Sequence, residues 1–410
     1  MKNIFIPIFF VCLCVFSQTS NKSVLAKYTD DEIKIDGVLD ETSWEAVAPA
    51  TNFYQYFPTD TAQAKRQVEI KFMFSDRNLY VGIKVYAKGK DYIIPSLRRD
   101  FRGGANDSVT LLFDTFNDGT NAFVFGSNPY GVRREILLSG GGNERQGFNS
   151  AWDTKWLGES VIHDDHYILE WKIPLSAFKY KEGETKWRFN SYHFDTQDNE
   201  RNTWINIPQN QNIYNLAFMG DLIFDRPLGK SKSPVSIIPF VNTITAKDFE
   251  NNENTSSFKI GGDAKLTIAN SMNLDLTLNP DFSQVEVDQQ VTNLTRFEVG
   301  LPERRQFFIE NSDLFGSFGD GRDSNPFFSR RIGIARNIDG ESIENRIIAG
   351  VRLSGKVNNN LRLGILSMQT DEDIGNEIHT VYNSVITLQH KVFSWSTISV
   401  LLIKQQATKD

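Results

Sequence analysis

A short segment near the middle of the sequence carries two tryptophans on either side of a charged pair. In SAWDTKWLGE, Trp152 and Trp156 flank Asp153 and Lys155, directly after the glycine-rich loop SGGGNERQGFNS. An indole face can stack on a pyranose ring, and a neighbouring carboxylate can accept hydrogen bonds from its hydroxyls. Trp152, Asp153 and Trp156 are therefore candidate sugar-binding residues at an exposed rim.

A second candidate group lies in FDTQDNERNTW, residues 194–204. It combines two opposite charges, Glu200 and Arg201, with the aromatic ring of Trp204. Such a polar edge with one aromatic ring suits ligand contact as well, and a solvated strand edge is the alternative.

Oxygen ligands gather in DTFNDG, where Asp114, Asn117 and Asp118 precede Gly119. Carboxylate and amide oxygens are the ligands that calcium prefers, although the spacing differs from that of the helix-loop-helix calcium loop. Calcium is therefore the one candidate cofactor, and a plain hairpin turn is the alternative.

The sequence gives little support for catalysis. It holds no Gly-x-Ser-x-Gly elbow, no His-Glu-x-x-His helix and no glycine-rich phosphate loop, and its five histidines are scattered. No catalytic residue is predicted. A pair of carboxylates for glycoside hydrolysis is defined by a distance in space that spacing along the chain does not give, so a glycoside hydrolase stays as a third hypothesis.

The elements that must position these residues are short strands. RQVEIKFMFSD, NLYVGIKVYAK, DSVTLLFDTF and YILEWKIPLSAF alternate or run apolar between turn residues, without interleaved helices. This pattern predicts an all-β protein with an N-terminal antiparallel β-sandwich over residues 24–225. Trp44 and Trp171 are predicted to pack in its core. A linker is predicted at residues 226–236, where Pro, Gly, Ser and Lys are mixed.

The second half, residues 237–410, has longer strands with one apolar and one polar face. Strands of about 9 to 11 residues with this alternation are typical of an outer-membrane β-barrel, so an antiparallel, incomplete membrane-type β-barrel is predicted, and the chain is expected to end inside it. A soluble sheet with one face on a core is the alternative. The predicted apolar face holds Ile260, Leu266, Leu274, Leu276, Val351 and Leu363, and the predicted polar face holds Lys265, Asp275 and Arg352.

Residues 1–17 have the pattern of an export signal. Lys2 precedes an apolar run that is too short to span a bilayer, and cleavage is predicted after Ser17. Both cysteines, Cys12 and Cys14, lie inside the signal, so a lipoprotein anchor is the alternative and the exported chain has no disulfide. The formal net charge of −7 argues against a nucleic-acid partner.

Five segments in order carry a resemblance to a known family: KIDGVLDETSWEAV, NLYVGIKVYA, DSVTLLFDTFNDGTNAFVFGSNPYGVRRE, WDTKWLGE and YILEWKIPLSAFKY. They resemble the carbohydrate-binding-module family 9-like domain, a sandwich related to the dopamine-monooxygenase N-terminal type. The segment that includes LTLNPDFSQVEVDQQVTNLTRFEVG is similar to the start of the uncharacterised domain that accompanies this sandwich in exported Bacteroidota proteins, where a barrel is expected.

The resemblance implies an exported protein associated with the outer membrane or cell surface of a Gram-negative bacterium. Its expected partner is a glycan or polysaccharide, with a link to carbohydrate catabolism. The alternative is a structural or docking module that binds envelope protein partners rather than sugar. LPERRQFFIEN could then fill a barrel lumen or dock onto the sandwich through Arg304, Arg305 and Glu310. An ordinary surface loop is the remaining interpretation of this segment.

Overall fold

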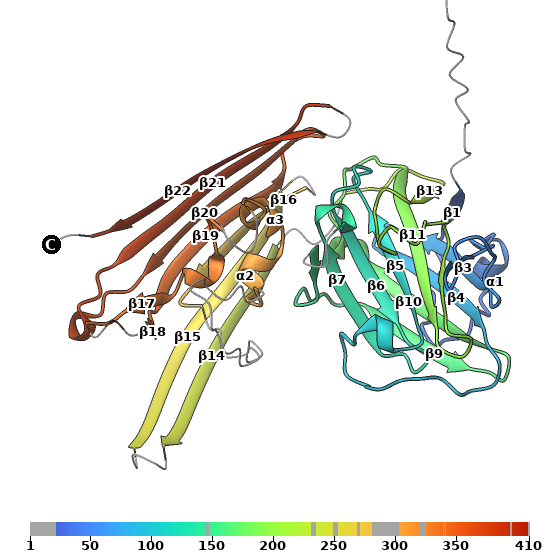
Figure 1. Ribbon diagram of the computed structural model, residues 1–410, viewed down its shortest axis with the longest axis horizontal. Helices are drawn as coiled ribbons and strands as arrows, with labels where there is room; N and C mark the ends of the chain where they lie inside the picture. The colour runs from blue at the N-terminus through green and yellow to red at the C-terminus, as the bar shows by residue number, and fades with distance from the viewer. Residues whose placement is uncertain are drawn as a thin grey trace, which may run out of the picture.

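The computed structural model describes residues 22–143, 147–230, 235–248, 253–268, 271–280, 303–319, 325–338, 340, 342–393 and 396–408. Its strands form two β-structures that lie beside each other, the first from β1 to β13 and the second from β14 to β22 (Figure 1). The all-β class predicted from the alternating patterns is confirmed. Helices in the described residues are single turns such as α1 (Thr42–Glu45).

The first structure is the predicted sandwich. Its strands follow one hydrogen-bonded order, β8-β7-β6-β5-β11-β13-β1-β3-β4-β10-β9, and β12 pairs with β11 and β2. Most neighbouring strands are antiparallel. The exception is β1, which pairs in parallel with both β3 and β13 and so joins the strands from β8 to β13 in this order to the strands from β3 to β9. The strands are β1 (Ser23–Tyr28), β2 (Tyr54–Phe57), β3 (Val68–Phe74), β4 (Asn78–Tyr86), β5 (Ser108–Asp114), β6 (Ala122–Ser127), β7 (Arg133–Leu138), β8 (Phe148–Asn149), β9 (Leu157–Ile162), β10 (His166–Pro174), β11 (Lys186–Asp195), β12 (Glu200–Thr203) and β13 (Gly220–Phe224).

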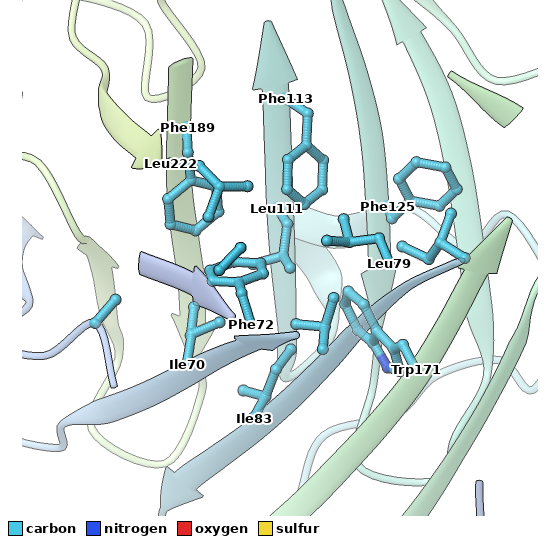
Figure 2. Close-up of a cluster of buried hydrophobic side chains, with 14 of the residues drawn as sticks. Ile70, Phe72, Leu79, Ile83, Leu111, Phe113, Phe125, Trp171, Phe189 and Leu222 are labelled. Atoms are coloured by element: carbon cyan, nitrogen blue, oxygen red, sulfur yellow. The ribbon is translucent and has the colours of Figure 1, made fainter. Parts of the chain in front are cut away.

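The sandwich core is rich in aromatic rings. Phe113 of β5 lies 5.6 Å from Phe189 of β11 and 6.2 Å from Phe72 of β3, measured between ring centroids. Figure 2 shows these rings pointing toward one another, with Trp171 of β10 among them. Aromatic side chains bury the most apolar area per residue, so they supply much of the packing energy of the described residues, which contain no cysteine.

Trp44 anchors the start of the sandwich. Its ring is buried, and its Nε1 donates a hydrogen bond to Glu170 Oε1 at 3.3 Å. The other oxygen of Glu170 accepts from the backbone N–H groups of Asp36 and Gly37. Gly37 has a φ of 81°, which glycine adopts without steric cost. The predictions that Trp44 and Trp171 pack in a core are confirmed.

The second structure is a seven-stranded antiparallel sheet in the order β14-β15-β16-β19-β20-β21-β22. Among the described strands β14 and β22 are both edges, so these residues form an open sheet. A short ribbon, β17 (Ile334–Arg336) and β18 (Ser342–Glu344), stands apart. The sheet strands are β14 (Val235–Asp248), β15 (Glu253–Ile268), β16 (Met272–Leu278), β19 (Ile347–Lys356), β20 (Leu361–Thr370), β21 (Val381–Lys391) and β22 (Thr397–Ala407).

The two faces of this sheet are as predicted. Cross-strand pairs place Leu276 opposite Val351, and Asp275 opposite Arg352, so apolar and polar rows alternate. The apolar row is the exposed one. The residues predicted on it are Ile260, Leu266, Leu276 and Val351, all exposed, with Leu274 and Leu363 half-buried; on the other face Asp275 and Arg352 are buried and Lys265 is half-buried.

A segment that we call the strap, residues 303–316, covers the polar face. It contains two single-turn helices, α2 (Gln306–Ile309) and α3 (Asp313–Gly316), which lie between the second sheet and the sandwich (Figure 1). Glu310 forms an ion pair with Lys265 and accepts a hydrogen bond from Asn273. Its phenylalanines pack on an apolar patch of the same face.

The strap also touches the sandwich, where Ile309 joins the sandwich core and Gln306 Nε2 donates to the carbonyl of Ala151 at 2.7 Å. The hydrogen-bond and ion-pair partners of Glu310, Lys265 and Asn273, belong to the second sheet, so the interpretation that Glu310 docks onto the sandwich stays a prediction. Arg305 instead pairs with Glu303 within the strap. Arg304 has its backbone N–H bonded to Glu303 as well.

No helix among the described residues is long and apolar enough to cross a membrane. The predicted export signal, residues 1–17, lies outside the described residues and stays a prediction. The predicted linker, residues 226–236, begins after β13 ends at Phe224, and its last two residues, Val235 and Ser236, already belong to β14.

Candidate functional site

The structure places both rings of the predicted tryptophan pair in the sandwich core. Trp152 and Trp156 are 4% and 3% exposed, and both pack against Phe125, at 5.8 and 5.5 Å between centroids. The expectation that they present open faces at a rim is therefore wrong. The connection between β8 and β9 turns them inward because the interior of the sandwich offers aromatic partners that water does not.

Charged groups surround this connection. Trp156 Nε1 donates to the buried carboxylate of Glu135 at 3.2 Å, and Arg99 forms an ion pair with the same carboxylate. Burial raises the pKa of Glu135 to about 7, although the hydrogen bond from Arg99 opposes the shift. Asp153 lies outside, with 71% of its side chain exposed and an Arg99 contact at 3.4 Å. Of the three predicted residues here, Asp153 is the one open to a ligand.

The second predicted group is divided between the two faces of its strand. Trp204 is buried in the core, with its ring 5.1 Å from that of Phe189, so the expected open ring at this edge is wrong as well. Glu200 is buried too and pairs with Lys65 at 3.3 Å. Arg201 points outward, because neighbouring residues of a strand alternate, and its side chain is exposed.

Arg201 lies between two aromatic rings. Its guanidinium carbon is 5.5 Å from the ring of Phe57 on β2 and 5.6 Å from the ring of Phe194 on β11. Phe57 is 39% exposed, which is high for a phenylalanine. A cation held on two rings this way keeps its N–H groups free to reach a ligand edge, so the surface combines an aromatic face with fixed donors.

A second arginine, Arg134, was missed from the sequence and lies beneath this surface, because Arg134 and Phe101 are each only 6% exposed. Arg134 of β7 lies with its guanidinium carbon 5.6 Å from the ring of Phe101. A Cβ on Gly103 would overlap the Arg134 guanidinium and touch Phe194 at 3.5 Å, so Gly103 marks the point where these groups meet. Arg134 Nε and Thr110 Oγ1 are both buried with no hydrogen-bond partner in the described residues. We call Phe57, Phe101, Arg134, Phe194 and Arg201 the arginine–phenylalanine strip.

The sequence offers one signal for the strip. In GVRREILL, Arg134 falls on the face opposite Glu135. A charged side chain in a core strand is costly to bury unless another group pairs with it, so the sequence indicates that Arg134 has a partner. The aromatic partners come from β2, β11 and a distant loop, which only the fold brings together.

Two of the three predicted calcium ligands, Asp114 and Asp118, already have protein partners. Asp114 accepts hydrogen bonds from the backbone N–H groups of Phe116 and Gly119, and Asp118 forms an ion pair with Lys356 of β19. Asn117 Nδ2 donates to the carbonyl of Lys186, whereas Asn117 Oδ1, the atom that could bind calcium, is buried with no hydrogen-bond partner in the described residues. Burial, followed by the charge of Asp118, raises the pKa of Asp114 to about 6. No cluster of three His, Cys, Asp or Glu residues suited to a metal occurs in the described part of the chain, and calcium stays a prediction.

The three predicted groups lie on different parts of the sandwich: the β8–β9 connection, strand β12 and the β5–β6 turn. The residues that offer exposed side chains for recognition are thus Asp153 in the first group and Arg201 in the second. The strip around Arg201 is the surface that joins cationic donors to aromatic rings.

The fold defines an all-β protein whose sandwich has an aromatic core and carries the exposed Arg201 beside the partly exposed Phe57. Residues 35–225 match the family model described as carbohydrate family 9 binding domain-like, and residues 234–406 match a Domain of unknown function (DUF5916). The sandwich resemblance stated from five segments is confirmed, as is the accompanying domain that follows it.

Two solved structures are similar to the chain. A carbohydrate binding module family 9 from Caldicellulosiruptor kristjanssonii in complex with cellotriose is 17% identical, with 52% of this chain and 96% of that chain covered and a TM-score of 0.36. A carbohydrate binding module family 9 from the same organism in complex with glucose is 17% identical, with 52% and 98% covered and a TM-score of 0.35. The comparison with curated proteins gives no match.

Proposed function

We propose that this chain binds carbohydrate through its sandwich and that the arginine–phenylalanine strip is the contact surface. The observation that carries the proposal is the family match over residues 35–225, the region that forms the sandwich. The strip adds a physical reason, since Phe57 offers a partly exposed ring beside a fixed cation.

The chemistry of the strip suits a sugar. A pyranose has an apolar C–H face, which stacks on an aromatic ring, and an equatorial belt of hydroxyls, which accept hydrogen bonds from guanidinium groups. Phe57 would supply the stacking face and Arg201 the donors. Asp153 remains a predicted ligand contact on the β8–β9 connection.

Binding of cellotriose and glucose by the full chain, measured by calorimetry, tests the proposal. Arg201→Ala is expected to weaken binding at least tenfold, and Phe57→Ala similarly, since each removes one of the two contacts. The matched control is Arg226→Ala, because Arg226 also lies over a ring, Tyr28 at 4.1 Å, but on β1's side of the sandwich. Equal affinities for the Arg201 and Arg226 variants would refute the strip, and no binding across a broad glycan panel would refute carbohydrate recognition.

We further propose that the protein is exported and associates with the outer membrane, where sugar capture would serve carbohydrate catabolism. A specific observation favours this: the exposed face of the second sheet is apolar, while its charged face is covered by the strap. Soluble proteins seldom expose so continuous an apolar face, and a bilayer is a solvent for it.

Flotation of the full chain with phosphatidylethanolamine and phosphatidylglycerol vesicles tests membrane association. Leu276→Lys places a charge on the apolar face and is expected to reduce association, because a midplane lysine costs about 2–4 kcal/mol. Asn360→Lys, in the exposed turn between β19 and β20, is the control and should change nothing. A wild-type chain that stays monomeric without detergent and does not float would contradict the membrane proposal. Stoichiometric envelope protein partners in a pull-down would then favour the docking-module alternative.

A further inference from the structure

Two sequence motifs that the proposed function leaves unused meet at one place. The β5–β6 turn, which holds Asp118, and the strap, which holds Glu310, line a common cavity of about 80 Å³. Lys356 of β19 and Arg362 of β20 complete its wall. The cavity is therefore built jointly by the sandwich, the strap and the second sheet.

The charges around this junction cavity balance. Three acids and three bases line it, and the closest pairs join opposite sides: Asp118 with Lys356, and Asp313 with both guanidinium nitrogens of Arg362 at 2.6 and 3.1 Å. The third acid, Glu310, is paired with Lys265 behind the wall. The third base, Lys179, donates to Thr267 Oγ1 at 3.0 Å. A cavity whose charges already neutralise one another offers no net attraction to an ion.

The rest of the lining is amphipathic. Asn121, Asn149 and Thr120 contribute amide and hydroxyl groups, while Phe116 and Phe123 contribute aromatic surface. Small polar groups arranged over aromatic surface are the mixture that binds a neutral molecule with many hydroxyls, since each hydroxyl finds a donor or an acceptor and the C–H face finds a ring.

The size of the cavity selects one sugar ring. One water needs roughly 10–15 Å³, so a cavity of about 80 Å³ holds several waters. At about 30 Å³ of liquid per water, these waters fill the space of a single pyranose. A longer oligosaccharide would have to leave the cavity.

We propose that the junction cavity is a second binding site for a neutral, polyhydroxylated ligand the size of one pyranose. Such a ligand contacts the sandwich and the second sheet at once, so it stabilises their docking. The site is separate from the arginine–phenylalanine strip and shares no residue with it.

Calorimetry with glucose on the full chain carrying Arg201→Ala, which weakens binding at the strip at least tenfold, tests the site at glucose concentrations where the strip is mostly empty. One binding event is expected. Adding Ser312→Met, which projects a larger side chain from the strap into the cavity, should weaken that event at least tenfold. Ser256→Met, an exposed position on β15, is the matched control and should bind as the Arg201→Ala protein does. Asn121→Ala serves as a second test if the methionine at 312 disturbs the strap.

Two further readouts sharpen the result. Phe123 of the cavity lies 5.6 Å from Trp152, so glucose should change tryptophan emission in the Arg201→Ala protein. Because the lining charges balance, glucuronate is expected to bind at least tenfold more weakly than glucose. The proposal is overturned if the Arg201→Ala protein binds no glucose, if Ser312→Met and Asn121→Ala leave its affinity unchanged, or if glucuronate binds as tightly. Loss of binding in Arg201→Ala with strong binding in wild type would leave the strip proposal intact.

Discussion

The sandwich and the second sheet use the same alternation of apolar and polar residues with opposite results. In the sandwich the apolar rows of β3, β5 and β11 point inward and meet one another. In the second sheet the apolar rows of β15, β16 and β19 point outward, and the inward face carries Asp275 and Arg352. Alternation therefore defines two faces but does not say which of them the fold covers.

The comparison predicts different weak points. The sandwich should fail when apolar volume is removed from its interior, because its stability comes from packing. The second sheet should fail when a charge is removed from under the strap, because its buried face is held by ion pairs and hydrogen bonds as well as by the apolar cluster of the strap.

The largest loss of stability is expected for Arg352→Met. Arg352 is 1% exposed, donates to Asp275 Oδ2 at 3.0 Å and lies over the ring of Phe307. Methionine preserves much of the volume but leaves Asp275 buried without its partner, which costs about 3–5 kcal/mol. Hydrogen exchange of β16 and β19 amides measures this loss. A cost under 1 kcal/mol would show that the buried face does not depend on the pair.

The next largest effect on the free energy of unfolding comes from making the same substitution, Ile→Ala, once in each region. Ile83 is fully buried in the sandwich, and Ile237 of β14 is 73% exposed. Ile83→Ala should lower the free energy of unfolding by about 2–5 kcal/mol, because a cavity remains. Ile237→Ala should change it by less than about 0.5 kcal/mol in water. The loss for Ile83→Ala is measured by urea unfolding followed by tryptophan fluorescence. The change for Ile237→Ala is measured by hydrogen exchange. Similar losses of stability at both positions would mean that other protein covers the side chain of Ile237 on β14.

Two buried carboxylates, one in each region, should respond to pH in opposite directions. Burial raises the pKa of Glu170 to about 7, although the N–H groups of Asp36 and Gly37 oppose it. Burial works in the same direction on Glu310, but Lys265 and Lys179 outweigh it and hold the pKa at about 2. The ordinary value for both is 4.5.

The signs follow from which state binds more protons. Between pH 4.5 and 7 the folded sandwich binds the Glu170 proton more tightly than the unfolded chain, so stability falls as pH rises. Between pH 4.5 and 2 the unfolded chain binds the Glu310 proton more tightly, so stability falls as pH falls. Glu170→Gln should flatten the first slope and Glu310→Gln the second, in unfolding experiments across pH. An unchanged slope in either variant would contradict the assigned group.

Sequence reasoning succeeded where a short-range pattern decides the outcome. Trp171 lies in a strand whose alternation points it inward, and the pairing of Leu276 with Val351 follows from two strands with the same period. It failed for Trp152 and Trp156, because the connection that holds them has no period from which to read a direction. The same two rings could line a rim or fill a core.

The strip and the junction cavity were out of reach for a different reason. Arg134, Phe101 and Phe57 come from separate strands and loops, and Asp118 meets Lys356 across 238 residues of sequence. The strip depends on how the strands and loops of the sandwich fold together, and the Asp118–Lys356 pair depends on how the sandwich and the second sheet dock. Local patterns encode neither. The strap motif LPERRQFFIEN was noticed for its charges, yet the partner of each charge had to come from the fold.

The smallest loss of stability is expected for Arg346→Met. This variant tests whether an exposed ion pair stabilises the second sheet as much as a buried one does. Arg346 precedes β19, forms an ion pair with Asp371 at 3.5 Å, and both side chains are largely open to water. Exposed pairs contribute about 0–1 kcal/mol, because water screens the attraction and two long side chains lose freedom. The expected loss is therefore under about 1 kcal/mol and should shrink further in 1 M salt, where screening extends over about 3 Å. The loss at Arg352 should persist in salt, since water does not reach that pair. Equal losses at the two arginines, measured by hydrogen exchange of the same strand, would mean that burial under the strap adds nothing to the strength of an ion pair.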